Sequence, residues 1–142
     1  MSLYAIDENK NKTDISNYVT ESEWTNLIAD NTTVTDDAGN KVKISYLRVR
    51  KIGKIVEVNG FASVTLAKAS GKFDNLNICR LPTQFKPYSQ CDFDHTDFDI
   101  DSITIWRKIR IDNTGISLSA YGMNTAQNYG VNFPIREFYT VK

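Results

Sequence analysis

The chain has 142 residues, and its 17 lysines and arginines balance its 17 aspartates and glutamates. Hydrophobic residues make up 41% and charged residues 24%, which is close to the average globular domain and argues against wholesale disorder or a fibrous repeat. A zero net charge lacks the basic excess of most nucleic-acid binders. No apolar run reaches the roughly 18 residues that a membrane span requires. We therefore expect one globular domain, with no nucleic-acid partner and no membrane insertion.

The N-terminal segment differs in character from the rest. Residues 1–23 are polar, with DENKNKTD almost wholly charged or amide-bearing, and predict an arm or spacer before a head domain over 24–142. Residues 20–30 fit two structures: a helix opened by a Thr20–Glu23 capping box, or a first strand. The start lacks the apolar core of a signal peptide. The two cysteines, Cys79 and Cys91, are therefore expected to be reduced.

From residue 44 onward, apolar and polar residues alternate with period two. In ISYLRVRKIGKIVEVNG, apolar Leu47 and Val49 alternate with polar or charged residues, Gly53 suits a tight turn, and alternation resumes at Val56. This pattern predicts a hairpin with one apolar face. Gly60 indicates a bulge or a close contact inside the second strand.

Further strands are expected along the chain. A short strand over 77–81 should stop at Pro82, and the turn-rich PTQFKPYS follows it. Residues 102–112 alternate again, with a possible register change at Trp106 and Arg107, and 113–115 should close a second tight hairpin onto 116–121. The run 131–139 predicts a last strand or strand pair around Pro134. These elements predict an all-β fold, either an antiparallel β-barrel or a jelly-roll-like sandwich, with a short polar N-terminal arm.

The segment DFDHTDFDID, residues 92–101, holds the only histidine. Alternation places Asp92 and Asp94 on one face, while His95 and Thr96 fall where two alternations change phase, which predicts a bend, a bulge or a turn tip. A half-buried strand with a solvated acidic face is the simplest interpretation. Calcium is the best metal alternative, but the glycine and terminal glutamate of the usual loop are missing. Zinc lacks its usual nitrogen and sulfur ligands. No metal or other cofactor is therefore expected.

An enzymatic interpretation would use two of these aspartates as the acid and base of a glycosidase, because their spacing permits it. That mechanism needs two carboxyl groups with different pKa values, and neighbours on one exposed face share one environment. The sequence contains no nucleophile-elbow or phosphate-loop motif, and its single histidine is the only candidate base for a catalytic triad. We expect no catalytic residues, and a polysaccharide hydrolase remains the alternative.

A basic stretch lies earlier in the chain. Residues 41–54 contain six lysines and arginines and no acid, so one hairpin face should be locally positive. Such a face attracts phosphate-bearing glycans or nucleic acid. It also fits an edge hairpin protected from aggregation by its charges, or a partner for the acidic stretch.

Four motifs in this order resemble the C-terminal head domain of siphophage receptor-binding and baseplate tail proteins, of the lactococcal-phage type. They are EWTNL with Trp24, YLRVRKIGKIVEVNG at 46–60, LPTQFKPYS at 81–89 and IRIDNTGISLSAYG at 109–122. The family shows a Trp-led segment, a YRK-x-G-x-V hairpin, an LP-x-x-[FY]-x-P turn and an I-x-I-x-x-x-G-x-I hairpin. The resemblance covers residues 24–142. The chain departs from the family because it has no long coiled-coil or collagen-like neck.

The resemblance implies a trimeric head, located in a virion tail beside other tail or baseplate proteins, that binds a host cell-surface saccharide without cleaving it. A bacterial carbohydrate-binding or adhesion module is a further alternative. Sugar sites combine an aromatic platform with a few fixed polar groups. The candidate platforms are Trp106, Tyr121 and Tyr129, although Trp106 also fits a core or trimer-interface position. The candidate hydroxyl partners are Asp94, His95, Asp97, Asp99 and Asn128.

Overall fold

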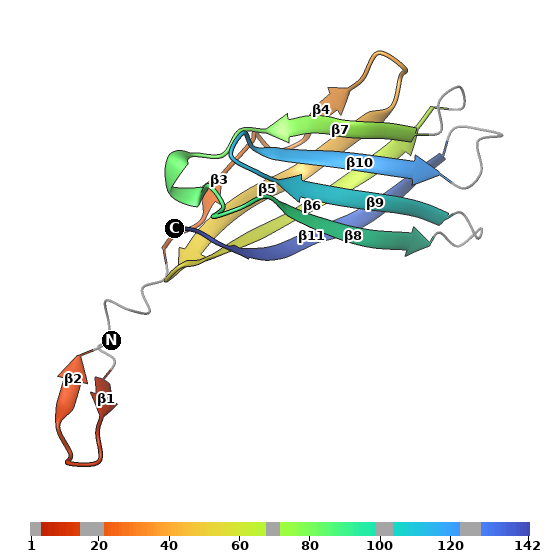
Figure 1. The fold of residues 1–142 in the computed structure, drawn as a ribbon. Helices are drawn as coiled ribbons and strands as arrows, with labels where there is room; N and C mark the ends of the chain where they lie inside the picture. Colours follow the sequence, from red (N-terminus) through yellow and green to blue (C-terminus); the bar gives the residue numbers. More distant parts are fainter. Residues whose placement is uncertain (1–3, 15–21, 68–71, 99–103, 123–128) are drawn as a thin grey trace.

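The computed structural model describes residues 4–14, 22–67, 72–98, 104–122 and 129–142, apart from a few side chains at the ends of these ranges. Two antiparallel sheets pack face to face (Figure 1). The predicted all-β fold is therefore confirmed, as a sandwich. The described part of the chain contains no helix long and apolar enough to cross a membrane.

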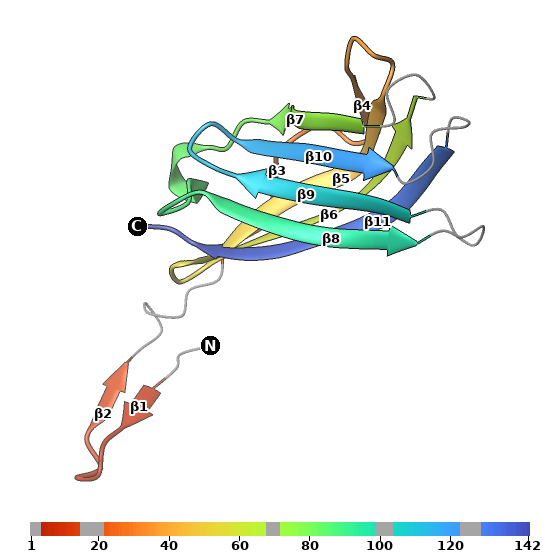
Figure 2. The ribbon, with the colours of Figure 1, turned by 45° about the vertical axis from the view of Figure 1, so that its right-hand side comes forward.

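The first sheet of the sandwich has five strands, in the order β11-β6-β5-β3, with β4 also paired to β5. Its strands are β3 (Thr25–Asn26), β4 (Thr32–Thr35), β5 (Lys41–Ile52), β6 (Ile55–Leu66) and β11 (Tyr129–Thr140). The second sheet has four strands, in the order β7-β10-β9-β8 (Figure 2). They are β7 (Lys72–Cys79), β8 (Cys91–Phe98), β9 (Thr104–Ile111) and β10 (Ile116–Gly122). A short 3-10 helix, η2 (Thr83–Phe85), connects β7 to β8, and β1 (Tyr4–Ile6) pairs with β2 (Lys12–Asp14) in a separate two-stranded sheet.

Both predicted tight hairpins are present. Gly53 lies in the turn between β5 and β6, where its φ is 61°. Glycine is favoured at this position because the backbone there is left-handed. Gly60 of β6 lies at a close approach: a Cβ at this position would be 2.7 Å from the carbonyl oxygen of Tyr46. The β5–β6 register also shifts between Ile44 and Tyr46. The expected close contact therefore occurs at Gly60, and the irregularity lies beside it in the partner strand β5.

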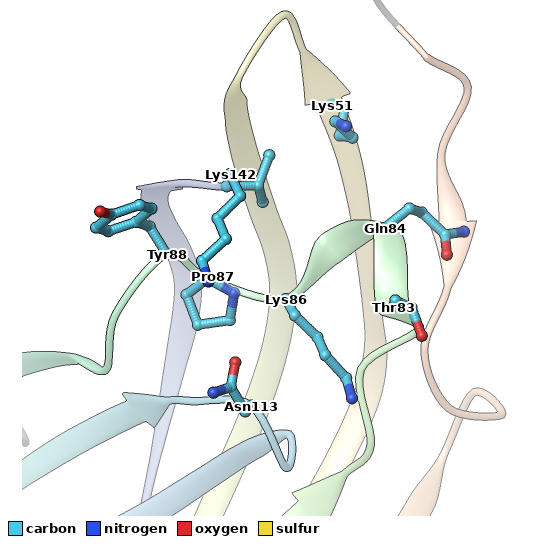
Figure 3. A pocket seen from close by; sticks show the side chains of 9 residues that line it. Lys51, Thr83, Gln84, Lys86, Pro87, Tyr88, Asn113 and Lys142 are labelled. Carbon is cyan, nitrogen blue, oxygen red and sulfur yellow. The ribbon is translucent and has the colours of Figure 1, made fainter.

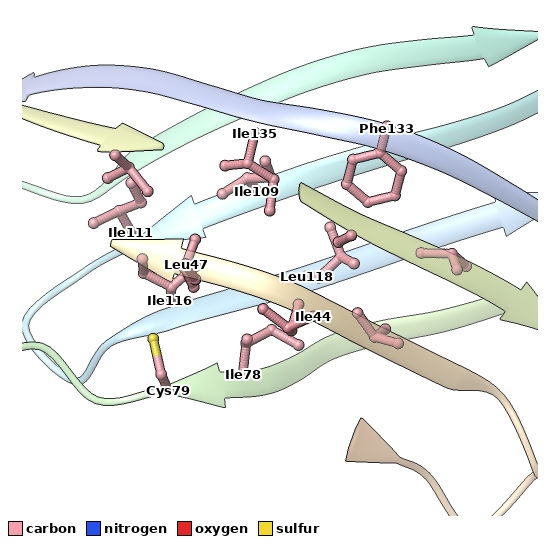
Figure 4. Close-up of a cluster of buried hydrophobic side chains, with 14 of the residues drawn as sticks. Ile44, Leu47, Ile78, Cys79, Ile109, Ile111, Ile116, Leu118, Phe133 and Ile135 are labelled. Carbon is pink, nitrogen blue, oxygen red and sulfur yellow. The ribbon is translucent and has the colours of Figure 1, made fainter. Parts of the chain in front are cut away.

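The core lies between the sheets and is built from the inward face of each strand (Figure 4). Fully buried side chains include Ile44 and Leu47 of β5 and Ile109 of β9. The period-two pattern predicts an apolar face with Leu47 and another with Ile109, and the register shift between Ile44 and Tyr46 lets Ile44 face the core as well. Cys79 is buried beside this core and forms no disulfide, in agreement with the expected reduced state. Burial raises the pKa of the Cys79 thiol to about 11.

Two sequence-based expectations about strand irregularity are wrong. β9 pairs with both β8 and β10 without a register shift, so no register change occurs at Trp106 and Arg107. Arg107 instead takes an inward position in a regular strand, where its guanidinium lies 3.9 Å from the ring centre of Phe133. β8 likewise runs through His95 and Thr96 without a bend. In both strands a polar side chain, Arg107 in β9 and His95 in β8, occupies an inward-facing position. In the sequence, a polar residue at such a position looks like a change of phase in the alternation.

The remaining differences concern strand limits. In the ambiguous region 20–30 the described residues include the strand β3 and no helix. The strand expected at 77–81 begins earlier, at Lys72, and ends at Cys79. The run 131–139 belongs to one strand, β11. Pro134 is tolerated there because β11 is an edge strand, where a missing N–H donor breaks no ladder.

Candidate functional site

Two predicted platform residues meet on the outer face of the four-stranded sheet. Trp106 of β9 is in register with Tyr121 of β10, and their ring centroids are 4.9 Å apart with planes tilted by 45°. Both side chains are half-buried. With Thr96 in register on β8, these rings form the centre of what we call the Trp106 surface, which comprises Asp74, Asp94, Thr96, Trp106, Lys108 and Tyr121.

The alternation of β9 and the register of its neighbours build this surface. Ile105, Arg107 and Ile109 are buried, so Trp106 and Lys108 between them face outward. On β8, Asp94 lies opposite Lys108. Cross-strand neighbours lie about 4.5–5.5 Å apart at Cβ, which brings acidic, basic, hydroxyl and aromatic groups together on one face.

Polar contacts hold the two rings in place. The Tyr121 hydroxyl donates a hydrogen bond to the Asp74 carboxylate of β7. This hydrogen bond raises the pKa of Tyr121, with a smaller contribution from desolvation. On the other side, the Lys108 ammonium lies 5.9 Å from the Trp106 ring centre, within the range of a cation–π contact. The platform is thus flanked by a carboxylate and an ammonium group that can also meet a ligand.

Two acidic residues of β8, Asp92 and Asp94, lie opposite basic residues of β9. Arg110 donates two hydrogen bonds to Asp92, from Nε to Oδ1 at 2.9 Å and from Nη2 to Oδ2 at 3.2 Å. The hydrogen bond from Arg110 is the main cause of the lowered pKa of Asp92. The next pair along is Asp94 opposite Lys108. Within the described part of the acidic stretch, Asp92 therefore has its ionic partner on the adjacent strand, and not on the basic hairpin of residues 41–54.

This arrangement has the chemistry of a saccharide-binding surface. The C–H face of a pyranose packs on an aromatic ring, and carboxylate, ammonium and hydroxyl groups at its edge bond to sugar hydroxyls. The described part of the chain gathers no group of three or more histidine, cysteine, aspartate or glutamate side chains that could hold a metal ion.

His95 does not belong to this surface, although it was predicted as a hydroxyl partner. Its Nε2 contacts Oε1 of Glu137 in β11, and the Glu137 carboxylate is buried. In a regular strand, residues on either side of Asp94 point to the opposite face. Because β8 has no bend, the His95 side chain leaves β8 on the face opposite to that of Asp94, toward β11, where it is 39% exposed. Its role as a hydroxyl partner stays a prediction.

The other predicted residues are placed only in part. Asp97 lies in β8 opposite Ile105, and Tyr129 begins β11 opposite Leu66, but their side chains are outside the described residues. Asp99 and Asn128 are also outside the described residues. The structure therefore brings together Asp94, Trp106 and Tyr121 of the predicted set.

The set of residues predicted from the sequence lacks Asp74, Thr96 and Lys108. The period-two pattern of β9 contains the signal for Lys108, since it lies two residues from Trp106. Thr96 lies beside Trp106 because β8 pairs with β9 through this position. The bend that was expected at His95 and Thr96 excluded such a pairing. The place of Asp74 beside Tyr121 depends on the β7–β10 pairing, which contains register shifts. No local feature of the sequence predicts that pairing.

The basic hairpin is also organised differently from the expected positive face. The guanidinium groups of Arg48 and Arg50 lie 4.6 Å and 4.5 Å from the Trp24 ring centre. Arg50 forms an ion pair with Glu57 of β6, at 2.8 Å. These contacts fasten the segment before β3 to the five-stranded sheet, so the two arginines and Trp24 have a structural role.

Comparison of the chain with protein-family models, curated proteins and solved structures gives no match.

Proposed function

We propose that this protein is a non-enzymatic receptor-binding head of a phage or prophage tail, and that it recognises a host cell-surface saccharide through the Trp106 surface. The observation that carries the proposal is the Trp106–Tyr121 ring pair, 4.9 Å between centroids, with charged side chains on both sides. The assignment to a tail, with other tail or baseplate proteins as neighbours, follows from the motif resemblance.

The geometry supports binding to an extended glycan. The surface is an open sheet face, and its polar groups come from three strands, β7, β8 and β9. An open face accepts a polymer chain without a free end, whereas a deep pocket selects a terminal sugar. Single sites of this kind bind weakly, so several copies in one particle would raise the apparent affinity.

A homotrimer is part of this proposal, and the outer face of the five-stranded sheet is the surface that suits contact between copies. Phe138 of β11 is 47% exposed there, and Tyr46 and Phe61 are also exposed. Arg136 lies beside them, with its guanidinium 5.7 Å from the Phe138 ring centre. Aromatic residues and arginine are enriched in protein interfaces. The other sheet then remains available for the saccharide.

The rival hydrolase finds less support among the described aspartates. A glycosidase acid needs a raised pKa and a second carboxyl group facing it across a groove. Arg110 lowers the pKa of Asp92, and Asp94 is exposed on the same open face, opposite Lys108. A bacterial carbohydrate-binding module would use the same surface without a virion.

An array of bacterial wall and surface saccharides tests the proposal. We expect the labelled protein to bind a subset of glycans, and Trp106→Ala to lose at least about tenfold in affinity, in line with about 1.4 kcal/mol for an aromatic contact. Trp24→Phe is the control. Product analysis by chromatography after long incubation separates binding from cleavage. Shortened glycans would support the hydrolase and contradict the proposal.

A further inference from the structure

A hollow lies at the end of the sandwich where the β5–β6 turn, η2 and the end of β11 meet. Its volume is about 360 Å³, within the range of small-molecule sites. Figure 3 shows Tyr88, Lys142, Lys86 and Asn113 arranged around Pro87. Asn113 of the lining lies in the turn between β9 and β10, whereas Trp106 and Tyr121 lie at the other end of this strand pair. The hollow is therefore separate from the Trp106 surface.

The lining of the hollow is strongly basic. Lys51, Lys86 and Lys142 contribute to it from three separate chain segments, and no acidic residue lines it. Among the described residues, none of the three ammonium groups forms an ion pair with a carboxylate. Three lysines that line one small volume give it a positive potential that attracts an anion.

Backbone hydrogen bonds hold this lining in place. Pro87 pairs with Val141 in an isolated bridge, and the Tyr88 N–H donates to the Thr140 carbonyl at 2.9 Å. The Val141 N–H donates to the Lys54 carbonyl at 3.0 Å. Pro87 and Val141 are themselves buried. The backbone floor of the hollow is therefore preformed, and a ligand would have to order only side chains of the lining.

One aromatic ring stands at the edge of the hollow. Tyr88 is 67% exposed, although exposing a large aromatic ring to water is unfavourable. The Lys142 ammonium lies 5.7 Å from its ring centre. An exposed ring beside an ammonium group suits a ligand that joins an anionic group to a compact polar ring.

We propose that this hollow is a second binding site, and that its ligand is a phosphate monoester carried on a sugar-sized ring. A monoester carries about −1.5 to −2 charges at neutral pH and offers three acceptor oxygens, which match three lysines better than a carboxylate does. Lysine binds phosphate as a point charge. Asn113 and Gln84 of the lining supply amide donors for ring hydroxyls. The proposal does not depend on saccharide binding at the Trp106 surface.

Isothermal titration with glucose 6-phosphate tests this site, at low salt and at about pH 7.5, above the second phosphate pKa of about 6. We expect one site per chain, and no heat from glucose at the same concentrations. Lys86→Gln with Lys142→Gln should weaken binding by about tenfold or more, because bonds to a charged group contribute about 1.5–3 kcal/mol. Lys43→Gln is the matched control, since Lys43 is exposed on β5 and does not line the hollow.

Tyr88→Ala tests the part of the proposal that concerns the ring. It should weaken glucose 6-phosphate by about two- to tenfold and leave inorganic phosphate unchanged. The proposal is overturned if glucose 6-phosphate gives no saturable binding, or if Lys43→Gln weakens it as much as the double variant does. Equal binding of inorganic phosphate and glucose 6-phosphate, with no effect of Tyr88→Ala, would overturn the ring assignment.

Discussion

The imidazole of His95 contacts the buried carboxylate of Glu137 across the boundary between the two sheets. β8 is an edge strand of the four-stranded sheet and β11 is an edge strand of the five-stranded sheet, and the two lie side by side (Figures 1 and 2). A side-chain contact therefore joins two edges that belong to different hydrogen-bond ladders. Arg107, which is in register with His95, adds a third polar group to this inner corner of the sandwich.

Removal of one partner of this pair should destabilise the fold. We expect His95→Leu to lower the free energy of unfolding by about 1–3 kcal/mol, because the buried Glu137 carboxylate loses its partner. The double variant with Glu137→Leu should recover a substantial part of the loss, since two apolar side chains replace the polar pair. Urea denaturation of the singles and the double measures the coupling. Strictly additive effects would contradict the inferred contact, and Thr96→Ala is the control on the outer face.

Gly60 should be hard to replace. An alanine Cβ would lie 2.7 Å from the Tyr46 carbonyl oxygen and 2.8 Å from Leu47 Cδ1, so β5 must shift away from β6. Overpacking of this kind costs about 1–3 kcal/mol. We expect Gly60→Ala to lower the urea midpoint accordingly, while Ser63→Ala on the same strand changes stability by less than about 0.5 kcal/mol. A Gly60→Ala protein as stable as the parent would disprove the close approach.

Asp112 makes part of the stability pH-dependent. Its Oδ1 accepts hydrogen bonds from the Thr114 hydroxyl at 2.6 Å and the Thr114 N–H at 2.8 Å. These bonds lower the pKa of Asp112 below its ordinary value of 3.8, with the hydroxyl contact the largest cause. A lowered folded-state pKa gives stability that is present above the ordinary value and is lost as the pH falls through the folded-state value.

Asp112→Asn should therefore flatten the acid limb of stability against pH, because asparagine does not titrate. The carboxylate is partly exposed, so the change should stay below about 1 kcal/mol. Thr114→Val should also flatten this limb, since it removes the hydroxyl donor that lowers the pKa of Asp112. Thermal unfolding between about pH 2 and 7 measures the effect. An unchanged limb in both variants would show that the turn makes no such contribution.

The proposed homotrimer has its own test. Multi-angle light scattering should give three times the mass of one 16.1 kDa chain. Phe138→Asp should shift the population toward the monomer, because it places a charge in an apolar contact. Ile6→Asp is a control, since Ile6 is also an exposed apolar residue, at 68%, and lies on the N-terminal hairpin. A parent protein that is monomeric at all concentrations would argue against the trimer.

The sequence predicts the strands well where side chains follow the period-two rule. The turn that pairs Ile111 with Ile116 also sets the register that pairs Trp106 with Tyr121, so half of the candidate surface follows from one hairpin. Inner polar residues could not be predicted in the same way. The alternation pattern predicts an irregularity at Arg107 and at His95, because only the tertiary fold supplies the ring of Phe133 and the carboxylate of Glu137 as their partners.

The remaining contacts are long-range in sequence. Asp74 meets Tyr121 across a β7–β10 pair with register shifts, and no local signal marks such a pair. The basic hollow is built from four chain segments that meet only in the folded protein. Its lysines lie at the ends of elements, where sequence patterns predict turns and carry no information about a shared cavity.

Fluorescence titration of the Trp24→Phe variant tests the central claim most directly. The chain has two tryptophans, so this variant reports on Trp106 alone. Titrated with the saccharide that binds most tightly on the array, it should bind as the parent does, with a saturable change in Trp106 emission. Trp106→Phe should give no such signal and at least about tenfold weaker binding. Full-strength binding with unchanged Trp106 emission would contradict the account.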